Sequence, residues 1–237
     1  MDLNRLDEVS YVVTAERFRE LNHDIQEKSS IDQIKGMVSD WCHINSSVEI
    51  QSLLGPLNEQ IQRISKRLGK KVHFELVGGE TLVSQELVNP VVQNLIHLVR
   101  NSVDHGIESP WDRGKKGQVG LISLRFSIDE ENGLLSIEFE DDGRGLDVRQ
   151  LISKAKKLGI VDDETLADQS VQSIYQLAFH EGLSTRKKVS SISGHGLGLP
   201  AIKSAVESIG GNLKLETQMG EVTEITLQVP AEDKISS

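Results

Sequence analysis

Residues 97–108 have the sequence HLVRNSVDHGIE, and this stretch decides the fold prediction because it separates polar from apolar residues on one helix. At about 100° per residue, its polar side chains fall within roughly 140° of arc. The polar face consists of His97, Arg100, Asn101, Asp104 and His105, and the opposite stripe of Val88, Val91, Val92, Leu95, Leu98 and Val99. The pattern predicts a helix with one face in a core and one face available for chemistry.

The polar face suits a metal-bound polyphosphate. An asparagine offers a neutral oxygen to Mg²⁺, arginine and histidine bind phosphate oxygens, and an unprotonated histidine or a carboxylate accepts a proton. The alternative is an amphipathic helix that simply carries a solvated face. The two glycine motifs further along the chain favour the first interpretation.

The composition is that of a soluble globular protein with one large or two small domains: 237 residues, 37% hydrophobic and 26% charged. No apolar run approaches the roughly 18 residues that span a bilayer, and the first ten residues lack the pattern of a signal peptide. We therefore expect a cytoplasmic protein without direct membrane insertion.

Charge and cysteine content exclude further classes. The net charge of −10 argues against a nucleic-acid surface, which normally needs a basic stripe. Cys42 is the only cysteine, so the chain has no internal disulfide and no cysteine-based metal cluster. An anionic small ligand remains possible if a metal and local dipoles neutralise it.

A heptad-like seam precedes the strands. It consists of Ile50, Leu54, Leu57, Ile61, Ile64 and Leu68, and Gly55 and Pro56 predict a break within it. Its partner helix is either a second copy of the chain, as in a homodimer, or the preceding segment around 34–41. We expect a helical segment over 1–68, a second, larger domain over 69–232 and a tail over 233–237.

Period-two patterns after residue 69 predict strands, and helical patterns lie between them. The strands are expected at 72–76, 122–128, 135–139, 213–215 and 225–229, and the helices near 147–158, 170–180 and 198–209. This order predicts an α+β fold, a two-layer sandwich in which helices cover one face of a mixed sheet.

The first glycine motif, DDGRG at 141–145, follows the strand at 135–139 directly. Asp141 is in phase with the inward-facing Leu135, Ile137 and Phe139, so its carboxylate is predicted to face a pocket, where an adenine amino group is a good donor. Gly143 and Gly145 allow a tight turn and close approach of a flat base. An ordinary DDG turn is the alternative.

The second glycine motif, GHGLGL at 194–199, opens a helix, and glycines before a helix N-terminus favour phosphate. A Rossmann fold does not fit, because no parallel βαβ unit surrounds the motif. Between the two motifs, Ser184 and Thr185 precede three basic residues at 186–188. This connection suits a mobile lid over phosphates, with a solvated basic loop as the alternative.

In this order the elements resemble the GHKL ATP-binding (Bergerat) fold shared by histidine kinases, gyrase, Hsp90 and MutL. The helix, the DDGRG turn, GLST at 182–185 and GHGLGL are most similar to the kinase domain of the CheA group. The resemblance covers roughly residues 57–230 and rests on four motifs in the correct order.

The resemblance implies ATP and Mg²⁺ as cofactors and assigns roles to individual residues. Asn101 becomes the Mg²⁺ ligand, Asp141 the adenine reader, and His97 the candidate base, because CheA-like kinases carry histidine where most GHKL enzymes carry glutamate. The remaining nucleotide-binding candidates are Arg100, Asp104, His105, Gly143, Gly145, Ser184, Thr185, Gly194, His195, Gly196, Leu197, Gly198 and Thr223.

Two features depart from the family pattern. The Gly-Thr pair of the closing strand is here Val222 and Thr223, with Gly220 two places earlier. In addition, neither a phosphotransfer domain nor a CheW-like domain is recognisable in the chain. His23 and His43 are the only N-terminal acceptor candidates, and we expect both to be structural or exposed.

The leading functional hypothesis is therefore phosphoryl transfer from ATP to a histidine of a separate phosphotransfer domain in two-component signalling, with a response regulator as the further partner. One alternative is a GHKL ATPase whose closure moves a partner. The other is a regulatory or phosphotransfer module without catalysis. Intact Asn101, Asp141 and GHGLGL argue against lost nucleotide binding.

Overall fold

The computed structural model describes residues 14–26, 30–167, 169–180, 182–183 and 198–231. The chain divides into two compact units between Val48 and Glu49. The first unit contains α1 (Ala15–Gln26) and α2 (Ile31–Ser46), which are joined by a hydrogen bond from the Trp41 indole to the Arg17 carbonyl oxygen, 3.2 Å long. β1 (Ser47–Glu49) lies at the boundary.

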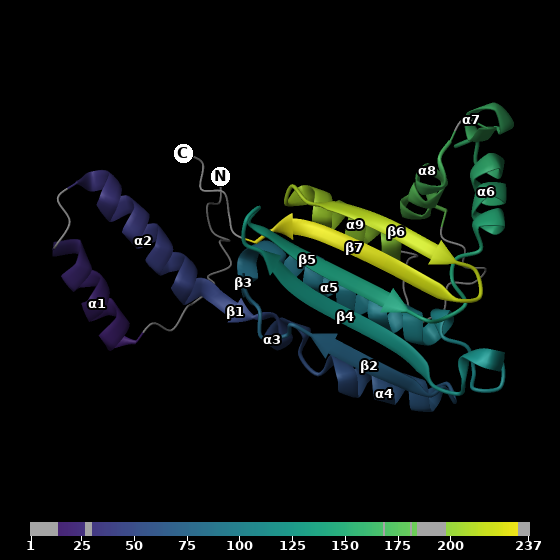
Figure 1. Cartoon of the computed structure of the whole chain (residues 1–237), viewed down its shortest axis with the longest axis horizontal. Helices are drawn as coiled ribbons and strands as arrows, with labels where there is room; N and C mark the ends of the chain where they lie inside the picture. Colours follow the sequence, from purple (N-terminus) through teal and green to yellow (C-terminus); the bar gives the residue numbers. More distant parts are fainter. Residues whose placement is uncertain (1–13, 27–29, 168, 181, 184–197, 232–237) are drawn as a thin grey trace, which may run out of the picture. The chain divides into compact units, whose positions relative to one another are not determined.

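The second unit is built on a five-stranded sheet with the order β2-β4-β5-β7-β6 (Figure 1). β2 runs parallel to β4, and the other neighbouring pairs are antiparallel. The strands are β2 (Val72–Val77), β4 (Gly120–Asp129), β5 (Leu134–Asp141), β6 (Asn212–Gln218) and β7 (Val222–Pro230); the short β3 (Leu82–Ser84) lies outside this sheet.

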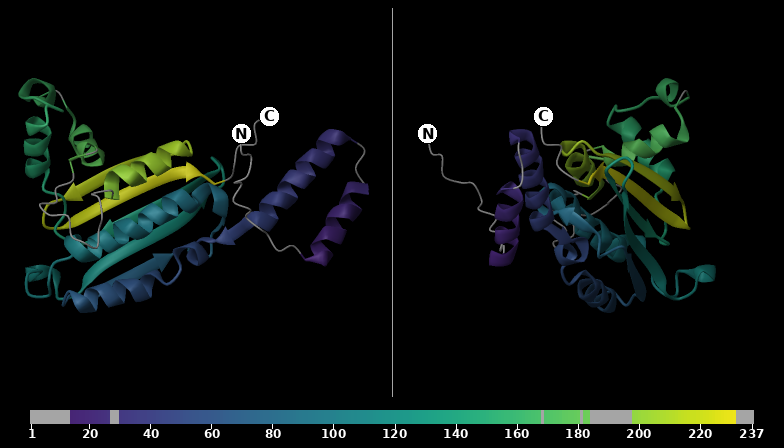
Figure 2. Two further views of the ribbon diagram at one scale, coloured as in Figure 1. Left: turned by 180° about the vertical axis from the view of Figure 1, so that it is seen from behind. Right: turned by 60° about the vertical axis from the view of Figure 1, so that its left-hand side comes forward.

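Helices cover one face of the sheet, as the view from behind shows (Figure 2). This layer is formed by α4 (Leu57–Arg67), α5 (Gln85–Asn101) and α9 (Gly198–Ser208), and α5 packs against both of the others. A π-helical turn, η1 (Ser102–Gly106), continues α5. The remaining elements are α3 (Ile50–Leu54), η2 (Gly114–Lys116), α6 (Val148–Lys157), α7 (Asp163–Ala167), α8 (Val171–Gln176) and η3 (Leu177–Phe179).

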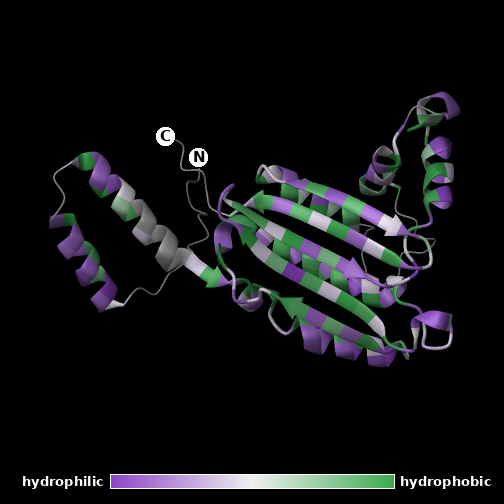
Figure 3. Cartoon of the chain, in the orientation of Figure 1, coloured by the Kyte–Doolittle hydropathy of each residue, from purple (hydrophilic) through white to green (hydrophobic). Residues whose placement is uncertain are grey.

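The core lies between the sheet and the helical layer. Hydrophobic and hydrophilic residues alternate along the strands (Figure 3), and on β5 Leu135, Ile137 and Phe139 point inward and are buried. On α5, the six residues of the predicted apolar stripe are all buried. The predicted α+β two-layer sandwich is confirmed, and each predicted strand is present.

The partner of the heptad-like seam differs from both alternatives. Gly55 and Pro56 separate α3 from α4, as expected. However, Ile50, Leu54, Leu57 and Ile61 are buried in the main core, where α3 and α4 pack against α5 and α4 also packs on β2. The seam therefore contacts its own domain, because α5 and β2 offer apolar surfaces that a pattern within one helix cannot reveal.

The unit boundary differs accordingly from the expected one. Residues 49–68 belong to the second unit and not to an N-terminal helical segment, whereas the tail at 233–237 lies outside the described residues. No helix in the described part of the chain is both long and apolar enough to cross a bilayer.

Candidate functional site

A cavity of about 680 Å³ opens among the C-terminal end of α5, the start of α9 and the strands β5, β6 and β7. This volume is within the range of roughly 300–1,000 Å³ typical of small-molecule sites. Its lining includes six of the predicted binding residues: Asn101, His105, Asp141, Gly145, Gly198 and Thr223. Apolar side chains such as Leu98, Phe139, Leu215 and Ile225 complete the walls.

Asp141 provides a buried carboxylate in this lining. It ends β5, and only 5% of the residue is exposed, as its phase with the inward-facing positions of that strand predicts. Burial raises its pKa, although the hydrogen bond from the Gly143 N–H and the proximity of the Ser102 hydroxyl oppose the shift. Asp142 points away and accepts a hydrogen bond from the Leu121 N–H, 2.8 Å long.

The turn that follows Asp141 needs glycine at two positions. A Cβ atom on Gly143 would lie 2.5 Å from the Gly106 carbonyl oxygen and 2.7 Å from the Asp141 carboxylate. Gly145 has φ +63°, and a Cβ atom there would overlap the Gln218 carbonyl oxygen. The DDGRG turn is therefore packed between the end of η1 and the end of β6.

The polar helix face changes its geometry where the cavity begins. After Asn101 the chain forms the π turn, in which the Ile107 N–H donates to the Ser102 carbonyl oxygen five residues back. Asn101 and His105 line the cavity on either side of this transition. The Asn101 amide nitrogen also lies close to Gly198, where an added Cβ would be 3.1 Å away.

Of the predicted polar face, Asn101 and His105 line the cavity, and the other three residues do not. Arg100 donates two hydrogen bonds to the Gln60 side chain of α4, and the Asp104 carboxylate lies 3.1 Å from His105 Nε2. His97 is exposed on α5, one helical turn before Asn101. Neither His97 nor Arg100 nor Asp104 belongs to the cavity lining.

Lys70 supports the π turn from outside. Its ammonium donates to the carbonyl oxygens of Val103 and Asp104, at 2.8 and 2.7 Å. Burial lowers the pKa of this lysine, while the nearby Asp104 carboxylate opposes that shift.

The predicted lid residues Ser184, Thr185, Gly194, His195, Gly196 and Leu197 lie outside the described residues.

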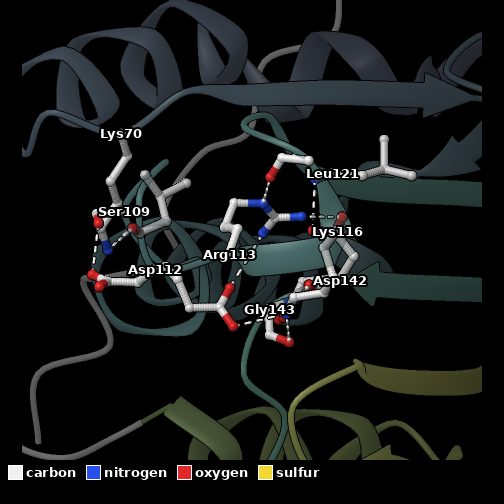
Figure 4. A network of polar contacts seen from close by, with 12 residues as sticks. Lys70, Ser109, Asp112, Arg113, Lys116, Leu121, Asp142 and Gly143 are labelled. Atoms are coloured by element: carbon white, nitrogen blue, oxygen red, sulfur yellow. Dashed lines mark hydrogen bonds and ion pairs between the residues drawn. The ribbon is translucent and has the colours of Figure 1, made fainter.

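A polar network behind the DDGRG turn was not predicted from the sequence (Figure 4). Arg113 and Lys116, from the loop between η1 and β4, contact Glu108, Asp142 and Gly143. In sequence, the segment RGKKG at 113–117 has the pattern of a solvated basic loop. The buried arginine is visible only once the fold brings residues 108–117 beside residue 142.

The comparison with known families decides the identity of the fold. Residues 89–233 match the model of the histidine kinase-, DNA gyrase B- and HSP90-like ATPases. The chain belongs to this family. The matched region contains most of α5, the DDGRG turn and all strands from β4 to β7, so it includes the lining residues described above.

Within this ATPase family the chain is similar to CheA proteins, which confirms the predicted resemblance. It is 33% identical to chemotaxis protein CheA of Bacillus subtilis over 77% of this chain and 27% of that protein. It is 34% identical to CheA of Salmonella typhimurium over 72% of this chain and 25% of that protein. The chain spans about a quarter of the length of these relatives.

A third relative aligns with the N-terminal helices as well. The sensor histidine kinase CheAY of Helicobacter pylori is 26% identical over 97% of this chain and 31% of that protein.

Membership of the ATPase family makes the chain an ATP-binding protein. Among the described residues, no three His, Cys, Asp or Glu side chains are arranged to hold a metal ion by themselves.

Proposed function

We propose that this chain is the catalytic part of a CheA-like kinase, which transfers the γ-phosphoryl group of ATP to a histidine on a separate phosphotransfer domain. The observation that carries the proposal is the buried Asp141 carboxylate in a cavity that Asn101 also lines. One end of this cavity suits an adenine amino group, and the other suits a metal-bound phosphate. ATP combines both.

Asp141 is proposed to accept a hydrogen bond from the adenine amino group, with the Gly143 and Gly145 backbone beside the base. Asn101 is proposed as the protein ligand of Mg²⁺. This fits a site without an acidic metal cage, because Mg²⁺ keeps several waters and takes its other ligands from phosphate. When bound, Mg²⁺ neutralises charge on the β- and γ-phosphates.

Phosphates are proposed to lie toward the start of α9, where the backbone N–H groups of a helix N-terminus favour anions. Gly198 and His105 line this part of the cavity, and Gly194, His195, Gly196, Leu197, Ser184 and Thr185 are proposed to cover it. Thr223 is proposed as a further contact from β7. Arg100 and Asp104 are proposed to support the site through Gln60 and His105, respectively.

His97 is proposed as the general base. In the transfer, one nitrogen of the acceptor imidazole attacks the γ-phosphorus, and the bond from that phosphorus to the β–γ bridging oxygen breaks in line. The electron pair of this bond leaves with ADP, and the other imidazole nitrogen loses its proton to His97. Exposure of His97 supports this role, since the acceptor domain must approach from outside.

The acceptor histidine and a response regulator that then receives the phosphoryl group are the proposed partners. This assignment draws on the similarity to CheA proteins and to a sensor histidine kinase.

We propose the cytoplasm as the location, because ATP is available there. Homodimerisation is proposed through α1 and α2, where Phe18 and Ile31 are 63% and 71% exposed. The mass of the full chain in solution decides between monomer and dimer.

The proposal is tested with γ-labelled ATP, Mg²⁺ and a phosphotransfer domain. Acid-labile, base-stable label on that domain is expected for phosphohistidine. A variant of the domain without its histidine is the control. ATP binding and hydrolysis with no label on any histidine would instead favour an ATPase that moves a partner. Binding without turnover would favour a regulatory module.

A further inference from the structure

Lys116, which is not part of the cavity lining, holds two consecutive carbonyl groups of the DDGRG turn. Its ammonium donates to the Asp142 carbonyl oxygen at 2.9 Å and to the Gly143 carbonyl oxygen at 2.8 Å (Figure 4). A third bond, 2.7 Å long, joins it to the Glu108 carboxylate. All three donor positions of this ammonium are therefore used within one small region.

In both peptide units the carbonyl oxygen accepts a hydrogen bond from Lys116, and the N–H donates a hydrogen bond to another group. The peptide between residues 142 and 143 donates from Gly143 N to the Asp141 carboxylate, at 3.0 Å. The next peptide donates from Arg144 N to the Gly106 carbonyl oxygen, also at 3.0 Å. A positive charge at the carbonyl end polarises a peptide and strengthens its N–H as a donor.

Arg113 keeps the ammonium in place. Its side chain is fully buried and donates to Asp142 at 2.5 Å, to the Glu108 carboxylate at 3.2 Å and to the Gly117 carbonyl oxygen at 3.1 Å. Glu108 thus binds both cations, and two carboxylates balance two positive charges. Lys116 cannot reorient without breaking a buried network, so its contacts to the turn are preorganised.

We propose that Lys116 is a positioning residue that acts through the peptide between residues 142 and 143 to set the Asp141 carboxylate. The effect is on base selection: the fixed carboxylate accepts from a purine amino group at position 6 and repels a carbonyl oxygen there. This inference rests on the proposed function, in which Asp141 reads adenine. It adds that the choice of adenine over hypoxanthine depends on a lysine outside the cavity.

The test compares the affinities of the full chain for ADP and for inosine diphosphate (IDP), measured by calorimetry. In Lys116→Met, ADP binding is expected to weaken roughly 10-fold while IDP binding is unchanged, so the preference for adenine decreases. The matched control is Lys115→Met, which alters the exposed neighbouring lysine and should leave both affinities unchanged. Lys116→Arg, which keeps a positive charge at this position, should retain most of the preference for ADP over IDP.

A purely structural role predicts a different result, in which both nucleotides weaken equally, and that result would overturn the inference. If Lys116→Met does not fold, Lys116→Gln with the same two ligands replaces it. The amide proton shift of Gly143 gives a second readout in either variant. It should move upfield when the polarising charge is removed, and an unchanged shift contradicts the proposed path.

Asp141→Asn separates this inference from the proposed function. If Asp141→Asn keeps the adenine preference, the assignment of Asp141 is wrong, and with it the basis of the inference. If it abolishes the preference while Lys116→Met retains it, only the role of Lys116 is wrong. In the double variant, Lys116→Met should add no further loss of preference, because both changes act through one carboxylate.

Discussion

The Lys70 ammonium lies 2.7 Å from the carbonyl oxygen of Asp104, within the π turn that carries His105 into the cavity. The same ammonium reaches the Val103 carbonyl oxygen. One residue of the segment before β2 thus fixes two carbonyl groups that follow α5. The geometry of the cavity wall depends on this contact across the fold.

Lys70→Met should therefore lower the free energy of unfolding by about 1–3 kcal/mol, because the turn loses a charged donor to two carbonyl oxygens. Chemical denaturation measures this change. Hydrogen exchange at Ile107, whose N–H closes the π turn, should accelerate. Lys71→Met is the control, since Lys71 is exposed and contacts the Gln118 side chain; an equal loss in both variants would contradict the role of Lys70.

Asp141→Asn is expected to stabilise the nucleotide-free protein while it weakens ADP binding by at least about 10-fold. Burial raises the pKa of Asp141, so the folded protein binds this proton more tightly than the unfolded chain. Stability is lost as pH rises from about 3.9 through the folded-state pKa, and asparagine removes that loss.

Thermal unfolding of both forms between pH 3 and pH 7 tests this expectation. The advantage of Asp141→Asn should be absent at the acidic end and grow toward neutral pH. Glu138→Gln is a suitable control, because Glu138 lies on the same strand but is exposed. If Asp141→Asn is less stable than the parent protein at every pH, the ionised carboxylate does not destabilise the folded protein.

Asn101→Ala should abolish the Mg²⁺-dependent part of nucleotide affinity and leave the fold intact. The reason is that Asn101 faces the cavity, whereas the buried stripe of α5 carries the packing. Calorimetry of ADP with Mg²⁺ and with EDTA measures the two contributions separately. Identical Mg²⁺ dependence in the variant and the parent protein would rule out Asn101 as the ligand.

His97→Ala should leave nucleotide affinity unchanged and slow phosphoryl transfer by about 10²- to 10⁴-fold, if the imidazole acts as general base. Single-turnover transfer from labelled ATP to the phosphotransfer domain separates this step from binding. Gln93→Ala, one turn earlier on the exposed side of α5, serves as the control. A His97→Ala enzyme as fast as its parent leaves this histidine without a catalytic role.

Gly145→Ala should impair both stability and ADP binding, because a side chain there combines a positive φ with overlap of the Gln218 carbonyl. Gly159→Ala is the matched control: Gly159 has φ +69° but open space around its Cβ position. The control should lose only about 1–2 kcal/mol, the cost of a left-handed residue. Equal melting temperatures for the two variants would show that close packing at Gly145 is unimportant.

Local patterns were enough to predict the sheet and the direction of Asp141. Period two along β5 places Asp141 with Phe139 and Asp142 with the outward residues, and the structure agrees. The apolar stripe of α5 follows from its period in the same way. These predictions succeed because they depend only on residues within one element.

Contacts between distant segments were not predictable in this way. The π turn after Asn101 changes the helical phase of Asp104 and His105, which a helical wheel with one period does not show. Arg100 precedes this turn and contacts Gln60 of α4, a partner that a pattern within one helix cannot reveal. Lys70, Arg113 and Lys116 had no sequence signal, because each acts on carbonyl or carboxylate groups 26 to 34 residues away or across a loop. A lysine that binds backbone oxygens resembles any surface lysine in sequence.

The burial of α3 and α4 determines which residues a shortened form of this protein must retain to keep its core. Ile50 and Leu54 from α3, with Leu57 and Ile61 from α4, are fully or almost fully buried against α5 and its neighbours, yet the family match begins only at residue 89. A chain shortened to that match would lose β2 from the sheet and the Lys70 contacts to the π turn, and would expose the flank of α5. The compact unit that begins at Glu49 is thus larger than the region that the family match covers.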